Sequence, residues 1–110
     1  MNKVISWTIS TLAVLATAYI LPGVHINDFV TALIVALVLG IINTFLKPLI
    51  IILTLPINLL SLGLFTLIIN ALLILLAANI VPGFIVDGFW WALLFSIVLS
   101  IINSFLHKAI

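Results

Sequence analysis

The histidine and aspartate side chains of this sequence could act as acids, bases or metal ligands: His25, Asp28, Asp87 and His107. A catalytic site requires a nucleophile close to a base, and no such set accompanies either aspartate. The two histidines fall at opposite ends of the predicted membrane helices, so they cannot share a metal within one chain. We therefore predict no catalytic, cofactor-binding or metal-binding residues, and the protein is not expected to be an enzyme.

The elements that carry these residues must be membrane helices. Of the 110 residues, 67% are hydrophobic and 5% are charged, which lies outside the range of soluble globular proteins. There is no Cys for disulfides or thiolate ligands, and no basic run to bind nucleic acid. The predicted partner is the lipid bilayer, and no small-molecule substrate is identifiable.

We predict an all-α integral membrane domain over residues 1–110. A helix needs roughly 20 apolar residues to cross the hydrocarbon. Dividing the chain at its charges and Pro-Gly pairs gives four spans, at about 4–21, 29–46, 59–81 and 89–106. Residues 22–28 and 82–88 are predicted to be tight turns, because Pro ends a helix and Gly supplies a positive φ.

The first span has an alternative interpretation as a signal peptide. Lys3, an apolar run and a small-residue segment at 16–18 resemble a cleavable leader. However, Ile9, Leu12 and Leu15 recur sixty residues later inside the third span, where no signal peptide can lie. We therefore interpret the first span as a retained helix.

The charges predict the orientation. On the four-span plan Lys3, Lys47 and Lys108 fall on one side, and Asp28 and Asp87 on the other. The positive-inside rule then places both termini in the cytoplasm. The 19 helical steps from Asp28 to Lys47 cover about 28 Å, which matches the hydrocarbon core.

Aromatic residues mark the predicted membrane interfaces. Trp90 and Trp91 begin the fourth span at its outer end, Trp7 lies near the inner end of the first span, and Tyr19 lies near its outer end. Amphipathic rings suit this position. An aromatic lining for a ligand is the alternative.

The chain contains an internal repeat. Residues 18–50 and 78–110, aligned at an offset of 60, are identical at 15 of 33 positions without gaps. Repeat units at about 1–50 and 61–110 predict two tandem helical hairpins in the same orientation, related by a pseudo-twofold axis along the membrane normal. Residues 48–58 have no counterpart. A bend near Pro48 is expected, after which the segment lies along the interface or re-enters the membrane; a continuous helix is the alternative.

Polarity within the spans follows helical faces. Residues 32, 36, 40, 43 and 47 share one face of the second helix, and the fourth helix repeats this face at an offset of 60. The candidate residues for helix packing or for lining a pore are Gly40, Asn43, Asn70, Ser96, Ser100 and Asn103. Packing through small residues and interhelical hydrogen bonds is one interpretation. A water-filled path in an oligomer is the other, because an amide in hydrocarbon requires a partner or water.

Several motifs carry a family resemblance that covers essentially the whole chain. They are the runs at 43–48 (NTFLKP), 53–56 (LTLP), 62–65 (LGLF), 69–72 (INAL), 81–84 (VPGF) and 88–90 (GFW). In these motifs the chain resembles phage holin superfamily IV, a family of small bacterial four-span membrane proteins. The resemblance implies a protein that accumulates in the cytoplasmic membrane and opens lesions for a lytic enzyme. It implies no catalytic or ligand-binding residues.

The chain departs from characterised holins in two respects. Met1 is its only Met, which leaves no second start site, and its C-terminus lacks a strongly charged tail. The main hypothesis is a holin-like protein whose homo-oligomers form membrane lesions or pores. The alternative is a non-pore envelope or stress-associated scaffold. A small four-span exporter or channel is a third class, which the lack of a membrane-embedded carboxylate argues against.

Overall fold

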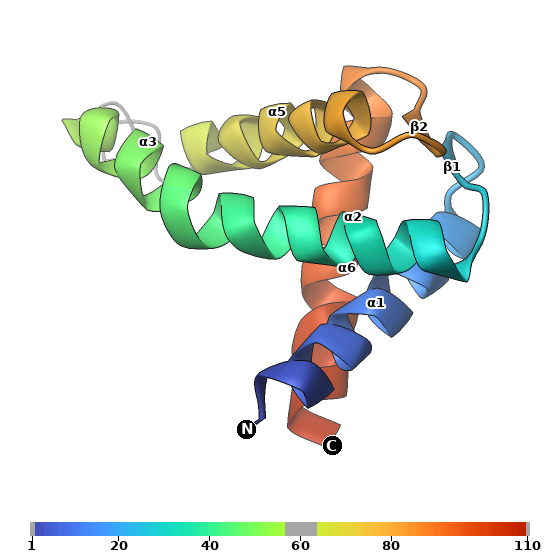
Figure 1. The fold of residues 1–110 in the computed structure, drawn as a ribbon. Coiled ribbons are helices and arrows are strands. Elements are labelled where there is room, and N and C mark those ends of the chain that lie inside the picture. Colours follow the sequence, from blue (N-terminus) through green and yellow to red (C-terminus); the bar gives the residue numbers. More distant parts are fainter. Residues whose placement is uncertain (1, 57–63, 110) are drawn as a thin grey trace.

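The computed structural model describes residues 2–56 and 64–109 and is built mainly of helices (Figure 1). Two long helices and a strand form the first part of the chain, in the order α1 (Lys3–Ile20), β1 (Val24–Ile26) and α2 (Phe29–Ile41). A π-helical turn, η1 (Ile42–Leu46), leads into α3 (Lys47–Leu53). The same order of helix, strand and helix returns as α5 (Leu64–Ile80), β2 (Phe84–Val86) and α6 (Phe89–Ala109).

Within the described residues, three helical stretches are long and apolar enough to cross a membrane. They are Lys3–Ile20, Phe29–Leu53 and Phe89–Ala109, and the apolar helix Leu64–Ile80 is shorter. These bounds lie close to the predicted spans, except that the second helix was expected to end at residue 46. The first part of the predicted span 59–81, residues 59–63, lies outside the described residues.

The segments predicted as tight turns, 22–28 and 82–88, also form a small two-stranded sheet, which the sequence did not predict. Strand β1 pairs with β2 in antiparallel register, with His25 opposite Ile85. Pairing satisfies backbone N–H and C=O groups of both segments. Two more bonds extend the ladder: the Asn27 N–H donates to the Gly83 carbonyl (3.2 Å) and the Asp87 N–H donates to the Gly23 carbonyl (2.9 Å).

At this end of the molecule, backbone hydrogen bonds recur at an offset of sixty residues. Asn27 and Asp87 are sixty positions apart, as are Gly23 and Gly83, so the two extra bonds are equivalent to each other. Likewise, the Leu21 N–H donates to the Thr17 carbonyl, and sixty positions later the Val81 N–H donates to the Ala77 carbonyl. The offset seen in the sequence therefore recurs in the backbone hydrogen bonding.

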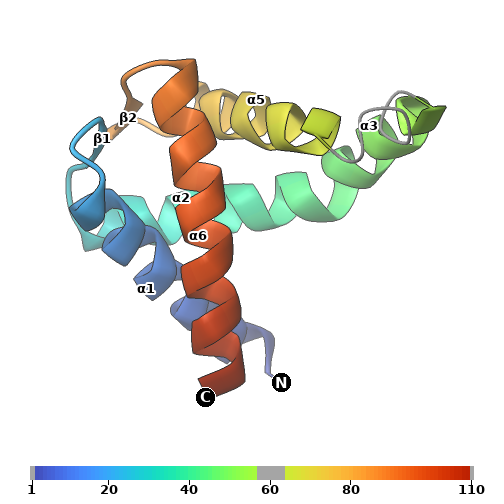
Figure 2. The same ribbon diagram turned by 180° about the vertical axis from the view of Figure 1, so that it is seen from behind.

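The helices diverge from the sheet as two pairs. α1 and α6 run side by side to the N- and C-termini, which lie near each other (Figures 1 and 2). α2 and α5 run in a clearly different direction and reach α3 at the opposite end (Figures 1 and 2). α1 also packs on α2, and α5 packs on α6, so each repeat contributes one helix to each pair.

The core lies near the sheet, where the helices converge. Phe84 and Phe95 are fully buried, with ring centroids 5.5 Å apart. Small residues such as Ala13, Ala32 and Ala92 are also fully buried and allow close helix approach.

The second helix continues past the expected bend. Pro48 lacks an N–H and its ring collides with the carbonyl four residues earlier in a regular α-helix. Here the turn before it is widened to a π-helix, in which the Lys47 N–H bonds the Ile42 carbonyl. The wider turn accommodates Pro48, and the chain changes direction there without leaving the helix (Figure 2).

The outer surface is strongly apolar. Large hydrophobic side chains are exposed on every helix, including Tyr19, Phe45, Trp90 and Phe105, each with about 70% or more of its surface exposed. Soluble monomers rarely present contiguous apolar surface on this scale. The surface is that of a protein surrounded by lipid hydrocarbon.

Candidate functional site

The α1–α6 contact brings four polar side chains together as two pairs. Ser10 Oγ donates to Asn103 Oδ1 at 3.3 Å, and one helical turn further on Ser6 Oγ lies 3.0 Å from His107 Nε2. His107 Nδ1 is 2.8 Å from the Asn103 carbonyl oxygen, which can only accept a hydrogen bond. In neutral His107 the proton is therefore on Nδ1, and Nε2 accepts from the Ser6 hydroxyl.

Four of the other predicted residues meet at a second location. Asn43, Asn70, Ser96 and Ser100, together with Lys47, line a cavity of about 60 Å³ where α2, η1, α5 and α6 meet. Ser96 Oγ is buried and donates to the Leu93 carbonyl at 2.9 Å. The face that bears Ser96, Ser100, Asn103 and His107 on α6 thus divides, with its first part toward α2 and α5 and its second part toward α1.

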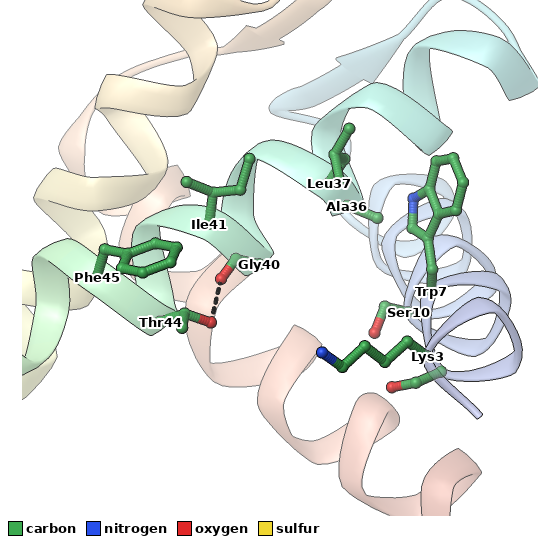
Figure 3. A pocket seen from close by; sticks show the side chains of 10 residues that line it. Lys3, Trp7, Ser10, Ala36, Leu37, Gly40, Ile41, Thr44 and Phe45 are labelled. Carbon is green, nitrogen blue, oxygen red and sulfur yellow. Dashed lines mark hydrogen bonds between the residues drawn. The ribbon is translucent and has the colours of Figure 1, made fainter. Parts of the chain in front are cut away.

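Gly40 is placed away from these amides, in an open groove of about 360 Å³ between α1 and α2. Figure 3 shows Lys3, Trp7 and Ser10 on one wall of this groove, and Leu37, Gly40 and Thr44 on the other. A Cβ added to Gly40 would meet no atom within 4 Å. The groove floor is therefore unfilled.

The two aspartates lie beside the sheet and differ in their contacts. Asp28 caps α2: its Oδ1 accepts from the Thr31 N–H and from the Thr31 hydroxyl, both at 2.8 Å. These two hydrogen bonds hold the pKa of Asp28 below its ordinary value, and the bond from the backbone N–H makes the larger contribution. Asp87 Oδ2 instead lies 3.4 Å from His25 Nε2, and both side chains are about half exposed.

The three tryptophans occupy different environments. Trp90 is 74% exposed, as expected of a ring at the membrane interface. Trp91 lies directly on Gly23, so that a Cβ at this glycine would overlap the indole. Trp7 donates its indole N–H to the Leu33 carbonyl on α2 at 2.9 Å. Two of the three rings thus also join segments of the chain.

The sequence did not predict the His25–Asp87 pair or the contact of Trp91 with Gly23. Ser6 and Ser10 stand at helical spacing on the small, polar face of the first span, but they were not among the candidate residues. The His25–Asp87 pair depends on strand register, for which the sequence carried no signal. Among the described residues, no group of three or more His, Cys, Asp or Glu is placed to hold a metal ion.

Similarities to known proteins agree with this architecture. The chain is 35% identical over 111 positions to the uncharacterized membrane protein YvlD of Bacillus subtilis, covering 96% of this chain and 93% of YvlD. It is 44% identical over 77 residues to the uncharacterized protein SCO3922 of Streptomyces coelicolor, covering 66% and 62% of the two chains. No solved structure matches. The model of the family described as mycobacterial 4 TMS phage holin, superfamily IV, matches residues 1–105, and the chain belongs to that family of bacterial membrane proteins.

Proposed function

We propose that this protein acts as a holin-like protein of the bacterial cytoplasmic membrane, with both termini in the cytoplasm, and that its homo-oligomers breach the membrane. The observation that carries the proposal is the open groove between α1 and α2. Its small and polar residues, among them Ser10, Ala36 and Gly40, interrupt a surface that is otherwise covered by large apolar side chains.

In hydrocarbon, helices associate where small residues let their backbones approach and where hydroxyl groups find partners. The groove offers both features, and it is lined by residues over almost three turns of α2 and η1, from Ala36 to Phe45. A helix from a second copy is the occupant we propose. Association through the groove would leave polar side chains such as Thr44 at an interface between protomers.

Induced expression in bacteria, followed by membrane potential and dye entry, tests this function. The wild-type chain is expected to depolarise the cells and to run as an oligomer after crosslinking. Gly40→Leu fills the groove and is expected to reduce both signals. Ser104→Leu introduces the same side chain at an exposed position of α6 and should preserve them. Cells that stay polarised and intact at high wild-type expression would rule the proposal out.

A second candidate function is a non-pore envelope or stress-associated scaffold. One observation favours it: Ser6, Ser10, Asn103 and His107 bond one another inside the protomer and so are not available to line a pore. For a scaffold, Asn70→Leu and Asn103→Leu are expected to change crosslinking to other membrane proteins without changing ion leak. A changed leak in these variants would count against it.

A further inference from the structure

The polar cavity between α2 and α5 is lined by positions whose equivalents, at an offset of sixty residues, form a direct contact between α1 and α6. Asn43 and Lys47 stand sixty positions before Asn103 and His107, and Ser10 stands sixty positions before Asn70. Between α1 and α6, Ser10 Oγ donates a hydrogen bond directly to Asn103 Oδ1 at 3.3 Å. In the part of the chain that the structure describes, no hydrogen bond joins Asn43 to Asn70, and the cavity separates their helices.

The cavity holds a positive charge that this chain cannot neutralise with a side chain. The sequence contains two acidic side chains, Asp28 and Asp87, and both lie beside the sheet. Lys47 lies at the other end of the helical run, about 28 Å from Asp28 at 1.5 Å per residue. Lys47 is partly buried beside the polar side chains of this cavity. Burial disfavours an unpaired charge, so an anion bound in the cavity would stabilise the charged form of Lys47.

Several polar groups around Lys47 can donate hydrogen bonds. Asn43 and Asn70 each carry an amide NH₂ group and Ser100 carries a hydroxyl, whereas the Ser96 hydroxyl is already bonded to Leu93. The π-helical turn borders this cavity, which Asn43 and Lys47 both line. π-Helical turns inside α-helices are frequent at functional sites.

We propose that this cavity binds a phosphate-class oxyanion, with Lys47 supplying the charge and Asn43, Asn70 and Ser100 supplying hydrogen bonds. About 60 Å³ suits one small tetrahedral group and is well below the size of sites for organic metabolites. Asn43 and Ser100 are exposed, so the cavity is accessible from outside the protomer. Two sources supply this chemistry: the phosphate of a membrane phospholipid, as in basic pockets between membrane helices, and inorganic phosphate. The site does not depend on whether the protein breaches the membrane.

Thermal unfolding of the full-length protein in detergent tests the proposal. The probes are short-chain phosphatidylglycerol, inorganic phosphate, and a short-chain diacylglycerol that lacks phosphate. The unfolding temperature is expected to rise with phosphatidylglycerol, with inorganic phosphate, or with both, and to stay unchanged with diacylglycerol. A response to phosphatidylglycerol alone assigns the site to lipid, and a response to inorganic phosphate assigns it to a soluble anion. No response to either phosphate compound overturns the proposal.

Matched lysine variants show whether the response comes from this cavity. Lys47→Met is expected to weaken apparent affinity at least tenfold, and Lys47→Arg to retain it. Lys108→Met removes the same charge from the exposed end of α6 and should bind as the wild type does. Asn70→Leu leaves the charge in place and provides a second test if Lys47→Met does not fold; a several-fold loss is expected. Equal affinities in the Lys47→Met, Asn70→Leu and Lys108→Met variants would overturn the proposal.

Discussion

The glycines of the two Pro-Gly turns have different roles, although they stand at equivalent positions. Gly83 has φ of +88°, in the left-handed region that side chains with a Cβ rarely adopt. Gly23 does not have a positive φ. Its lack of a side chain instead leaves space for the Trp91 ring. The prediction that Gly supplies a positive φ in these turns was therefore right for Gly83 and wrong for Gly23.

Replacing Gly83 by Ala is expected to destabilise the protein by about 1 to 2 kcal/mol, the cost of a left-handed conformation for a residue with a Cβ. The added methyl group would also lie 2.8 Å from Asn27 Nδ2. Gly40→Ala is the control, because a Cβ there meets no atom within 4 Å and Ala favours the helix. Unfolding in detergent measures both. Equal stability of the two variants would contradict this account of Gly83.

At the scale of the elements, α6 shows how one helical face meets different neighbours along its length. The face that begins at Ser96 and ends at His107 is continuous in the sequence. Because the two helix pairs diverge, its first part borders the cavity with α2 and α5, and its second part bonds α1. Periodicity predicts the face, but the crossing of the helices decides the partner of each residue.

The Ser10–Asn103 bond is expected to couple α1 to α6. In a double-mutant cycle with Ser10→Ala and Asn103→Ala, the coupling energy should be about 0.6 to 1.7 kcal/mol, the range for hydrogen bonds between membrane helices. Ser104→Ala provides the control on the exposed side of α6 and should show no coupling to Ser10→Ala. Stability is read from unfolding in detergent, and additive effects of Ser10→Ala and Asn103→Ala would argue against the bond.

The π-helical turn before Pro48 is another feature that belongs to the element scale. Pro within an apolar run indicated a bend, and a change of direction is present. The sequence left open whether the helix would stop there. It continues to Leu53 because widening one turn removes the clash with the proline ring at less cost than ending the helix in an apolar environment, where free backbone groups have no water.

For the whole molecule, the divergence of the two helix pairs constrains how it sits in a bilayer. Helices that run in different directions cannot all stand along the membrane normal, so tilt is required. The 25-residue stretch Phe29–Leu53 is about 37 Å long at 1.5 Å per residue, longer than a hydrocarbon core of about 30 Å. Tilting accommodates this excess length.

Both termini are expected to face the cytoplasm, since α1 and α6 run side by side to the same end of the molecule. Green fluorescent protein fused to either terminus should fluoresce, whereas alkaline phosphatase fused there should be inactive. Alkaline phosphatase inserted next to Asp87 should be active, because the sheet lies at the opposite end. Reporters at the two termini that disagree would contradict this topology.

The sequence by itself determined the membrane class and the approximate positions of the helices. Hydrophobic run length and Pro-Gly pairs are local properties of the chain, and they follow from residue type alone. The tertiary structure decided the pairing of the strands, the bond from Ser10 to Asn103, and the cavity around Lys47. These depend on how residues distant in the sequence are brought together, because the same small, polar face packs directly in one helix pair and stays open in the other.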